Sequence, residues 1–247
     1  MKKKLLIFLI IFIAPKYCNA QFLGYIESDK TNTIALNYLD DYFRYNGSED
    51  FIFDKPIHFK TKIPSISYED ESIFAEIAFN NFTANEMKTK YFSIDLLYKS
   101  VIPLTMPRSS FFAGIPFLLR TIYFSNSQEG NTYIRYISDF QEGDRYITRF
   151  ENGNIGIGSG IELRQSLRWV IVKLSYTASI YYSTTGFSFD YGLSNRNEIK
   201  FSLDFNEIFY DYGIRVGSKF FDCTWSMKDK KQNYYHSGFG FFAGLNF

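Results

Sequence analysis

The sequence is poor in cysteine and histidine, and it has no apolar run long enough to cross a membrane as a helix. Only two of the 247 residues are cysteine and only two are histidine. Cys18 falls in an expected leader segment, so Cys223 would have no partner for a disulfide or a cysteine metal site. A membrane-spanning helix needs about 20 residues. If the chain lies in a membrane, it must therefore cross as strands of a closed barrel.

An excess of either charge is also missing. The chain has 27 basic and 26 acidic side chains, and removing the four lysines of residues 1–20 leaves 23 against 26. Nucleic-acid-binding domains carry a basic patch or stripe, and interaction tails carry long runs of one charge. We therefore expect no nucleic-acid partner. The glycines at 156, 158 and 160 alternate along one strand face and precede no helix, so they indicate room inside a barrel and no dinucleotide site. We expect no cofactor and no metal.

Residues 1–20 have the pattern of a cleaved export signal. Three lysines follow Met1, ten apolar residues run from 5 to 14, and small residues stand at 18–20 before a cleavage site. A glutamine at the new N-terminus resembles exported proteins of Bacteroidota-type bacteria. The sequence thus predicts a signal peptide at 1–20 and one domain at 21–247.

Aromatic residues are abundant, and apolar and polar residues alternate along much of the chain. There are 28 phenylalanines and 20 tyrosines, which favour strands and populate the aromatic girdles of membrane barrels. The clearest alternation runs from Val170 to Ile180. The run Phe111–Phe124 is apolar on both sides, and its faces are not assignable from the sequence. The pattern predicts an all-β, closed, antiparallel, up-and-down transmembrane barrel of about ten strands, with eight or twelve as alternatives. A soluble β-sandwich is the other fold that this length permits.

The links between these strands alternate in length, as the short periplasmic turns and longer extracellular loops of outer-membrane barrels do. Short or compact links are expected near 69–71, 100–110, 165–167 and 207–209. Longer polar links are expected near 40–61, 81–90, 125–153, 184–195 and 224–235. We interpret 132–151 as a hairpin outside the membrane; if it entered the sheet, the strand number would be twelve.

The last ten residues alternate between large apolar side chains and mostly small ones. With these residues the chain resembles the small bacterial outer-membrane β-barrel superfamily. The resemblance implies an assembly signal at Phe241, Phe242, Leu245 and Phe247, with Phe242 where such signals usually carry glycine. It further implies a monomer in the cell outer membrane that meets the barrel assembly machinery, membrane lipid and lipopolysaccharide.

Charged residues of both signs fall on the predicted inward faces. Because a small barrel is filled by side chains, we expect these groups to form an ion-paired plug that satisfies buried charge. A narrow pore for small solutes, lined by the same groups, is the alternative. The expected cluster consists of Asp95, Lys99, Glu162, Arg164, Lys173, Lys200, Asp204, Arg215 and Lys219, with Glu69 and Glu76 facing the same lumen.

One group of residues has the chemistry of a hydrolase. Closure of a barrel makes the first and last strands neighbours, so His236 should lie near Asp40 and Asp41. A carboxylate beside a histidine is what the activation of water or a serine needs. The alternative is that polar residues at a rim simply meet water and headgroups. The chain lacks the His-x-Ser arrangement of lipid A deacylase barrels and the Asp-x-His pairing of omptin proteases. We therefore expect a structural or interaction role through extracellular loops, with a surface hydrolase acting on lipid A or peptide as an alternative.

Overall fold

A computed structural model describes residues 32–46, 56–84, 87–105, 110–130, 146–167, 169–185, 191–209, 212–228 and 233–247. The predicted signal peptide at 1–20 lies outside these residues and stays a prediction. The described chain forms ten strands: β1 (Thr33–Tyr45), β2 (Ile57–Glu69), β3 (Ile73–Ala84), β4 (Met87–Pro103), β5 (Phe111–Gly130), β6 (Tyr146–Ser166), β7 (Val170–Thr185), β8 (Tyr191–Phe209), β9 (Tyr212–Met227) and β10 (Tyr234–Asn246). No helix among the described residues is long and apolar enough to span a membrane.

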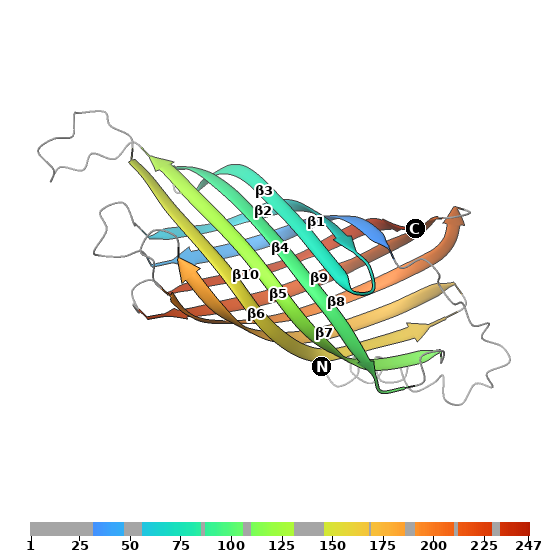
Figure 1. Cartoon of the computed structure of the whole chain (residues 1–247). Coiled ribbons are helices and arrows are strands. Elements are labelled where there is room, and N and C mark those ends of the chain that lie inside the picture. The colour runs from blue at the N-terminus through green and yellow to red at the C-terminus, as the bar shows by residue number, and fades with distance from the viewer. Residues whose placement is uncertain are drawn as a thin grey trace, which may run out of the picture.

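The ten strands close into one antiparallel barrel (Figure 1). Each strand pairs with its neighbours in the sequence, and β1 closes the sheet by pairing with β10 from Thr33↔Asn246 to Tyr45↔Tyr234. Closure pairs the outermost strands of the sheet, which is how an all-β protein satisfies its edge backbone groups. Between β2 and β3 the register is short, from Ser65↔Ala78 to Glu69↔Phe74. The predicted fold class and the number of ten strands are confirmed.

The two faces of the sheet differ in chemistry. In β1, Ala35, Asn37 and Leu39 are buried inside the barrel, while Leu36 and Tyr38 are exposed outside. The same alternation follows from the pleat of every strand. It also assigns the faces of β5, which the sequence left open. The exposed residues of the apolar outer belt include Ile34, Leu36, Ile77, Phe79, Leu96, Phe117, Leu119, Ile157, Ile180, Phe220, Phe241 and Leu245.

The barrel has two unlike ends. At the end where β1 begins and β10 finishes, called here the terminal end, the links are 70–72, 104–110, 167–169 and 210–211. At the opposite, loop end the links are 46–56, 85–86, 131–145, 186–190 and 228–233. The expectation of a longer link near 81–90 is wrong, because β3 continues to Ala84 and β4 starts at Met87. Asn81, Thr83, Lys88 and Lys90 belong to that paired hairpin, in which polar residues on both faces hide the alternation.

The segment predicted as a separate hairpin at 132–151 divides differently. Residues 146–151 are the start of β6 and pair with β5, from Tyr146↔Gly130 to Glu151↔Ser125. They therefore belong to the barrel wall, and they add no strand. Residues 131–145 lie outside the described part of the chain.

Two aromatic residues near strand ends lie inside the barrel. Trp225 is buried, donates from its indole nitrogen to Asn154 Oδ1 at 2.8 Å and stacks on Tyr234 with ring centroids 3.7 Å apart. Both residues occupy inward positions of the pleat. Trp169 is exposed and belongs to the link 167–169 at the terminal end.

Glycines in β6 allow close packing of the barrel wall against β7. A Cβ placed on Gly160 would lie 1.9 Å from the carbonyl oxygen of Tyr176, and one on Gly156 would lie 2.2 Å from that of Ile180. Backbone cannot yield as a flexible side chain can. The sequence predicted that these glycines make room inside the barrel. In the structure their effect lies in the wall, where they allow β7 to approach β6 closely.

We predict that Gly160→Ala lowers the free energy of unfolding by about 1–3 kcal/mol, because the added methyl group overpacks the wall. Gly153→Ala is the matched control on the same strand, since its Cβ would meet its nearest atom at 3.5 Å. Urea unfolding of refolded protein in detergent micelles, followed by gel mobility, measures both. Equal stability of the two variants would contradict the packing argument.

Candidate functional site in the lumen

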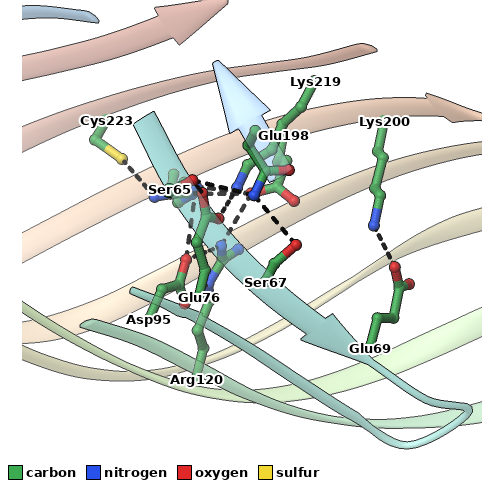
Figure 2. A network of polar contacts seen from close by, with 12 residues as sticks. Ser65, Ser67, Glu69, Glu76, Asp95, Arg120, Glu198, Lys200, Lys219 and Cys223 are labelled. Carbon is green, nitrogen blue, oxygen red and sulfur yellow. Dashed lines mark hydrogen bonds and ion pairs between the residues drawn. The ribbon is translucent and has the colours of Figure 1, made fainter. Parts of the chain in front are cut away.

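Four charged side chains meet near the middle of the lumen, and we call them the central charge cluster. Arg120 donates from Nε to Asp95 Oδ1 at 2.7 Å and from Nη2 to Glu198 Oε2 at 3.0 Å. Arg196 donates from Nη2 to the same Glu198 oxygen at 2.8 Å. Arg120 is 1% exposed. Two cations and two carboxylates thus neutralise one another in the interior, where an unpaired charge would be costly (Figure 2).

A second ion pair beside this cluster joins opposite walls of the barrel. Lys219 on β9 lies 2.5 Å from Glu76 Oε2 on β3, and Ser65 on β2 donates to the other oxygen of Glu76. Figure 2 shows Lys219, Glu76 and Ser65 close to the central charge cluster. Because β3 and β9 are not neighbours in the sheet, this pair crosses the lumen. It lies across the axis along which a solute would have to move.

A further group of charges, the terminal-end charge cluster, fills the lumen towards the terminal end. Arg215 lies 2.7 Å from Asp204 and 3.1 Å from Glu69, which also pairs with Lys200. Lys173 reaches the second oxygen of Asp204 at 2.8 Å. Because Glu69 is on β2 and its two partners are on β8 and β9, these contacts also cross the lumen. Lys99 and Glu162 form one more pair, 3.0 Å apart, between β4 and β6.

The structure places all nine residues of the predicted lumen cluster on the inner face of the wall. Eight of them take part in the ion pairs above. The guanidinium of the ninth, Arg164, lies 5.1 Å from the ring centroid of Phe112 near the terminal end.

Three members of the central charge cluster, Arg120, Arg196 and Glu198, were not predicted from the sequence. Arg120 is the one charge in the run Phe111–Phe124, whose faces the sequence leaves unassigned. Arg196 and Glu198 lie in β8, where the neighbouring outward residues 195 and 197 are asparagines. Polar and apolar residues therefore do not alternate there. For Arg120 the available signal was a single charged residue in an otherwise apolar run.

Aromatic side chains fill the lumen at the loop end, and we call them the aromatic layer. Phe43 is at its centre, with ring centroids 4.9 Å from Phe124 and 5.3 Å from Phe150. Aromatic pairs in these tilted geometries add to the stability that burial provides. The layer consists of Phe43, Tyr45, Phe59, Tyr91, Phe124, Phe150, Trp225 and Tyr234. It covers the lumen between the charged groups and the loop end.

The predicted contact between the first and last strands forms with one of the two aspartates. His236 Nε2 lies 2.7 Å from Asp41 Oδ1, inside the barrel, and both residues are buried. Asp40 lies on the outer face and is exposed, because consecutive residues of a strand point to opposite sides. Asp40 is therefore removed from the set that can act with His236.

The surroundings of the His236–Asp41 pair limit its chemistry. The ring of His236 lies 5.0 Å from that of Phe221 and 5.1 Å from that of Phe124. The pair lines a cavity of about 40 Å³, which has room for about one water molecule. Within the described part of the chain, no group donates a hydrogen bond to the second oxygen of Asp41, which is free to accept one from such a water. Among the described residues, no group of three His, Cys, Asp or Glu is placed to hold a metal ion.

The predicted assembly signal divides between the two faces of β10. Phe241, Leu245 and Phe247 are exposed on the outer belt, whereas Phe242 is buried in the lumen beneath the ammonium of Lys200, 5.2 Å away. A Cβ on the neighbouring Gly217 would lie 2.4 Å from the Phe242 ring. Phe242 thus fills a space inside the barrel. Recognition of these residues by the assembly machinery stays a prediction.

We predict that Arg120→Met lowers the free energy of unfolding by about 3–5 kcal/mol, because it leaves Asp95 and Glu198 buried with one partner fewer. Arg44→Met, at an exposed outward position of β1, is the matched control and should change stability by less than about 0.5 kcal/mol. Urea unfolding in micelles compares the two. A loss at Arg120 no larger than that at Arg44 would show that the cluster does not stabilise the barrel.

Comparison with known proteins gives similarities of structure alone. No protein-family model matches the sequence, and no curated protein matches it. The structure is similar to the outer membrane protease OmpT from Escherichia coli, with a TM-score of 0.49 and 10% identity over 89% of this chain and 96% of that one. It is also similar to a Pseudomonas aeruginosa FadL homologue, with a TM-score of 0.31 and 9% identity over 89% and 90% of the two chains. Neither similarity carries an inference about the activity of this chain.

Proposed function

We propose that this chain is a monomeric outer-membrane β-barrel with a filled lumen. Its role would be structural or would lie in interactions made by the links at the loop end, above all 46–56, 131–145 and 228–233. The observation that carries the proposal is the set of ion pairs that cross the lumen, together with the aromatic layer beyond them. A barrel filled in this way offers its outer face and its loops to partners, and not its interior.

The outer belt supports the membrane location. Leu36 on β1, Phe79 on β3 and Ile157 on β6 all point outward and are 67%, 68% and 70% exposed. Apolar surface that runs around a whole barrel would be costly in water, and it matches the hydrocarbon of a bilayer. Polar outward residues border the belt towards the loop end, such as Lys62 and Asp222. The signal peptide predicted at 1–20 agrees with this location.

The narrow pore ranks behind a filled barrel because the described charges are used in pairs. Lys219–Glu76 and Arg215–Glu69 join strands from opposite sides of the wall. The cavity beyond the central charge cluster, towards the terminal end, has a volume of about 60 Å³. Separate cavities of this size hold water molecules, whereas conduction of a solute needs a continuous path.

The surface hydrolase also ranks behind. The 2.7 Å contact between His236 and Asp41 is the observation in its favour. Ligand sites have volumes of about 300–1,000 Å³, and the cavity beside this pair has about 40 Å³. Lipid A whose mass changes in the presence of the protein, but not of its His236→Ala variant, would reverse this ranking.

We predict that Leu36→Lys weakens insertion into lipid bilayers by about 2–4 kcal/mol, because it places a charge in the apolar belt. Thr224→Lys is the control, since this exposed outward residue of β9 lies beyond Asp222 towards the loop end. Equilibrium folding into large unilamellar vesicles, measured by heat-modifiable gel mobility, compares the two. A wild-type chain that stays water-soluble and shows no mobility shift would refute the membrane location itself.

We predict that the wild-type protein, inserted into planar bilayers, gives no discrete conductance steps between −100 and +100 mV, a range of about the magnitude of physiological membrane potentials. Protease protection of the same sample in vesicles is the control for insertion. Reproducible steps from inserted protein would mean that the ion pairs leave a path, and the pore would replace the filled barrel as the proposed function.

A further inference from the structure

The outer face of the barrel has a groove over β6 and β7. Ser159 and Ala178 lie opposite each other in the register, and both point outward. The next outward pair towards the loop end is Ile157 and Ile180, and the next towards the terminal end is Ile161 and Tyr176. Two short side chains between longer ones leave a hollow in the belt. The groove has a volume of about 690 Å³, within the range of ligand-binding sites.

The groove is apolar along most of its lining and has two amide side chains on its β8 side. Leu119, Ile157 and Ile180 lie along it, whereas Asn195 and Asn197 of β8 form one side. Asn197 is held in place, because its oxygen accepts from the Tyr176 hydroxyl at 3.3 Å and its amide nitrogen donates to Asp222 at 3.1 Å. Asparagine amides on the outward face of a barrel at this position provide hydrogen bonds that a hydrocarbon chain alone cannot use.

A cation stands beyond the groove at the loop end. Tyr182 lines the groove, and its ring stacks on that of Tyr191 with centroids 6.2 Å apart. The ammonium of Lys228 lies 5.3 Å from the Tyr191 ring centroid and its side chain is exposed. Asn197 and Asn195 lie beside Ala178 and Ile180 in the register, and Leu193 follows beside Tyr182. Towards the loop end, the surface thus changes from mixed apolar and amide side chains to aromatic and then cationic ones. Tyrosine and lysine in this order are typical of a membrane interface facing anionic headgroups.

We propose that this groove binds one acyl chain of a phosphorylated, amide-bearing glycolipid of the lipid A type, in the leaflet at the loop end. The chain occupies the hollow over Ser159 and Ala178, Asn195 hydrogen-bonds to a linkage amide or hydroxyl, and Lys228 pairs with a phosphate. The inference rests on the proposed membrane location. The positive charge of Lys228 complements the phosphate, and the hollow fits a flexible chain better than the convex belt of a second copy.

The first experiment fills the groove from outside. Native mass spectrometry of the micelle-refolded full chain, titrated with diphosphoryl lipid A, measures the apparent affinity. Ala178→Phe should weaken binding about tenfold, since it excludes at least two methylene groups from contact. Ala243→Phe, an exposed alanine of the belt on β10, is the matched control and should bind as the wild type does. Equal affinity of the two variants would overturn the site.

The second experiment tests the headgroup. Lys228→Gln should lose the preference for diphosphoryl over dephosphorylated lipid A and leave the binding of the dephosphorylated lipid unchanged. Phosphatidylglycerol, tested on the wild type, separates the two sources of a lipid phosphate. Binding of phosphatidylglycerol as tightly as lipid A would overturn the glycolipid assignment. These outcomes are read only from chain that shows heat-modifiable mobility, so failure of the groove is distinct from failure of the membrane location.

Discussion

The pairing of β1 with β10 is the contact on which the rest of the structure depends. It satisfies the backbone groups of the first and last strands and turns a ten-stranded sheet into a closed wall with an inside and an outside. Once the wall closes, the pleat sends every second side chain into a narrow space. Charged residues that would meet water on an open sheet then have to find partners across the lumen.

The lumen meets this requirement in layers. Arg120 and Arg196 share two carboxylates near the middle, Arg215 and Lys200 share Glu69 towards the terminal end, and aromatic rings fill the loop end. Several of these contacts join strands that are far apart in the sheet. The ion pairs therefore do two things at once, because they neutralise buried charge and they brace opposite walls. The same contacts leave the His236–Asp41 pair in a small enclosed cavity.

A filled lumen moves the search for function to the outer face and the loop end. The belt around the barrel is apolar almost throughout, and it departs from this over β6, β7 and β8, where small residues form a groove beside two asparagines. Lys228 and two tyrosines continue this surface towards the loop end. The proposed lipid site uses only outward residues, so it is compatible with the ion-paired interior.

The sequence by itself determined the strands, their number and which residues of most strands face the lumen, because period-two alternation is a local property of the chain. The sequence also predicted that His236 lies near Asp41, because closure of the barrel makes the first and last strands neighbours. The partners across the lumen were decided by the tertiary structure alone. Arg120 and Glu198 meet although β6 and β7 separate their strands in the wall, because closure turns both side chains into the same narrow lumen. The groove over Ala178 likewise depends on which side chains neighbouring strands place beside one another, which no local pattern encodes.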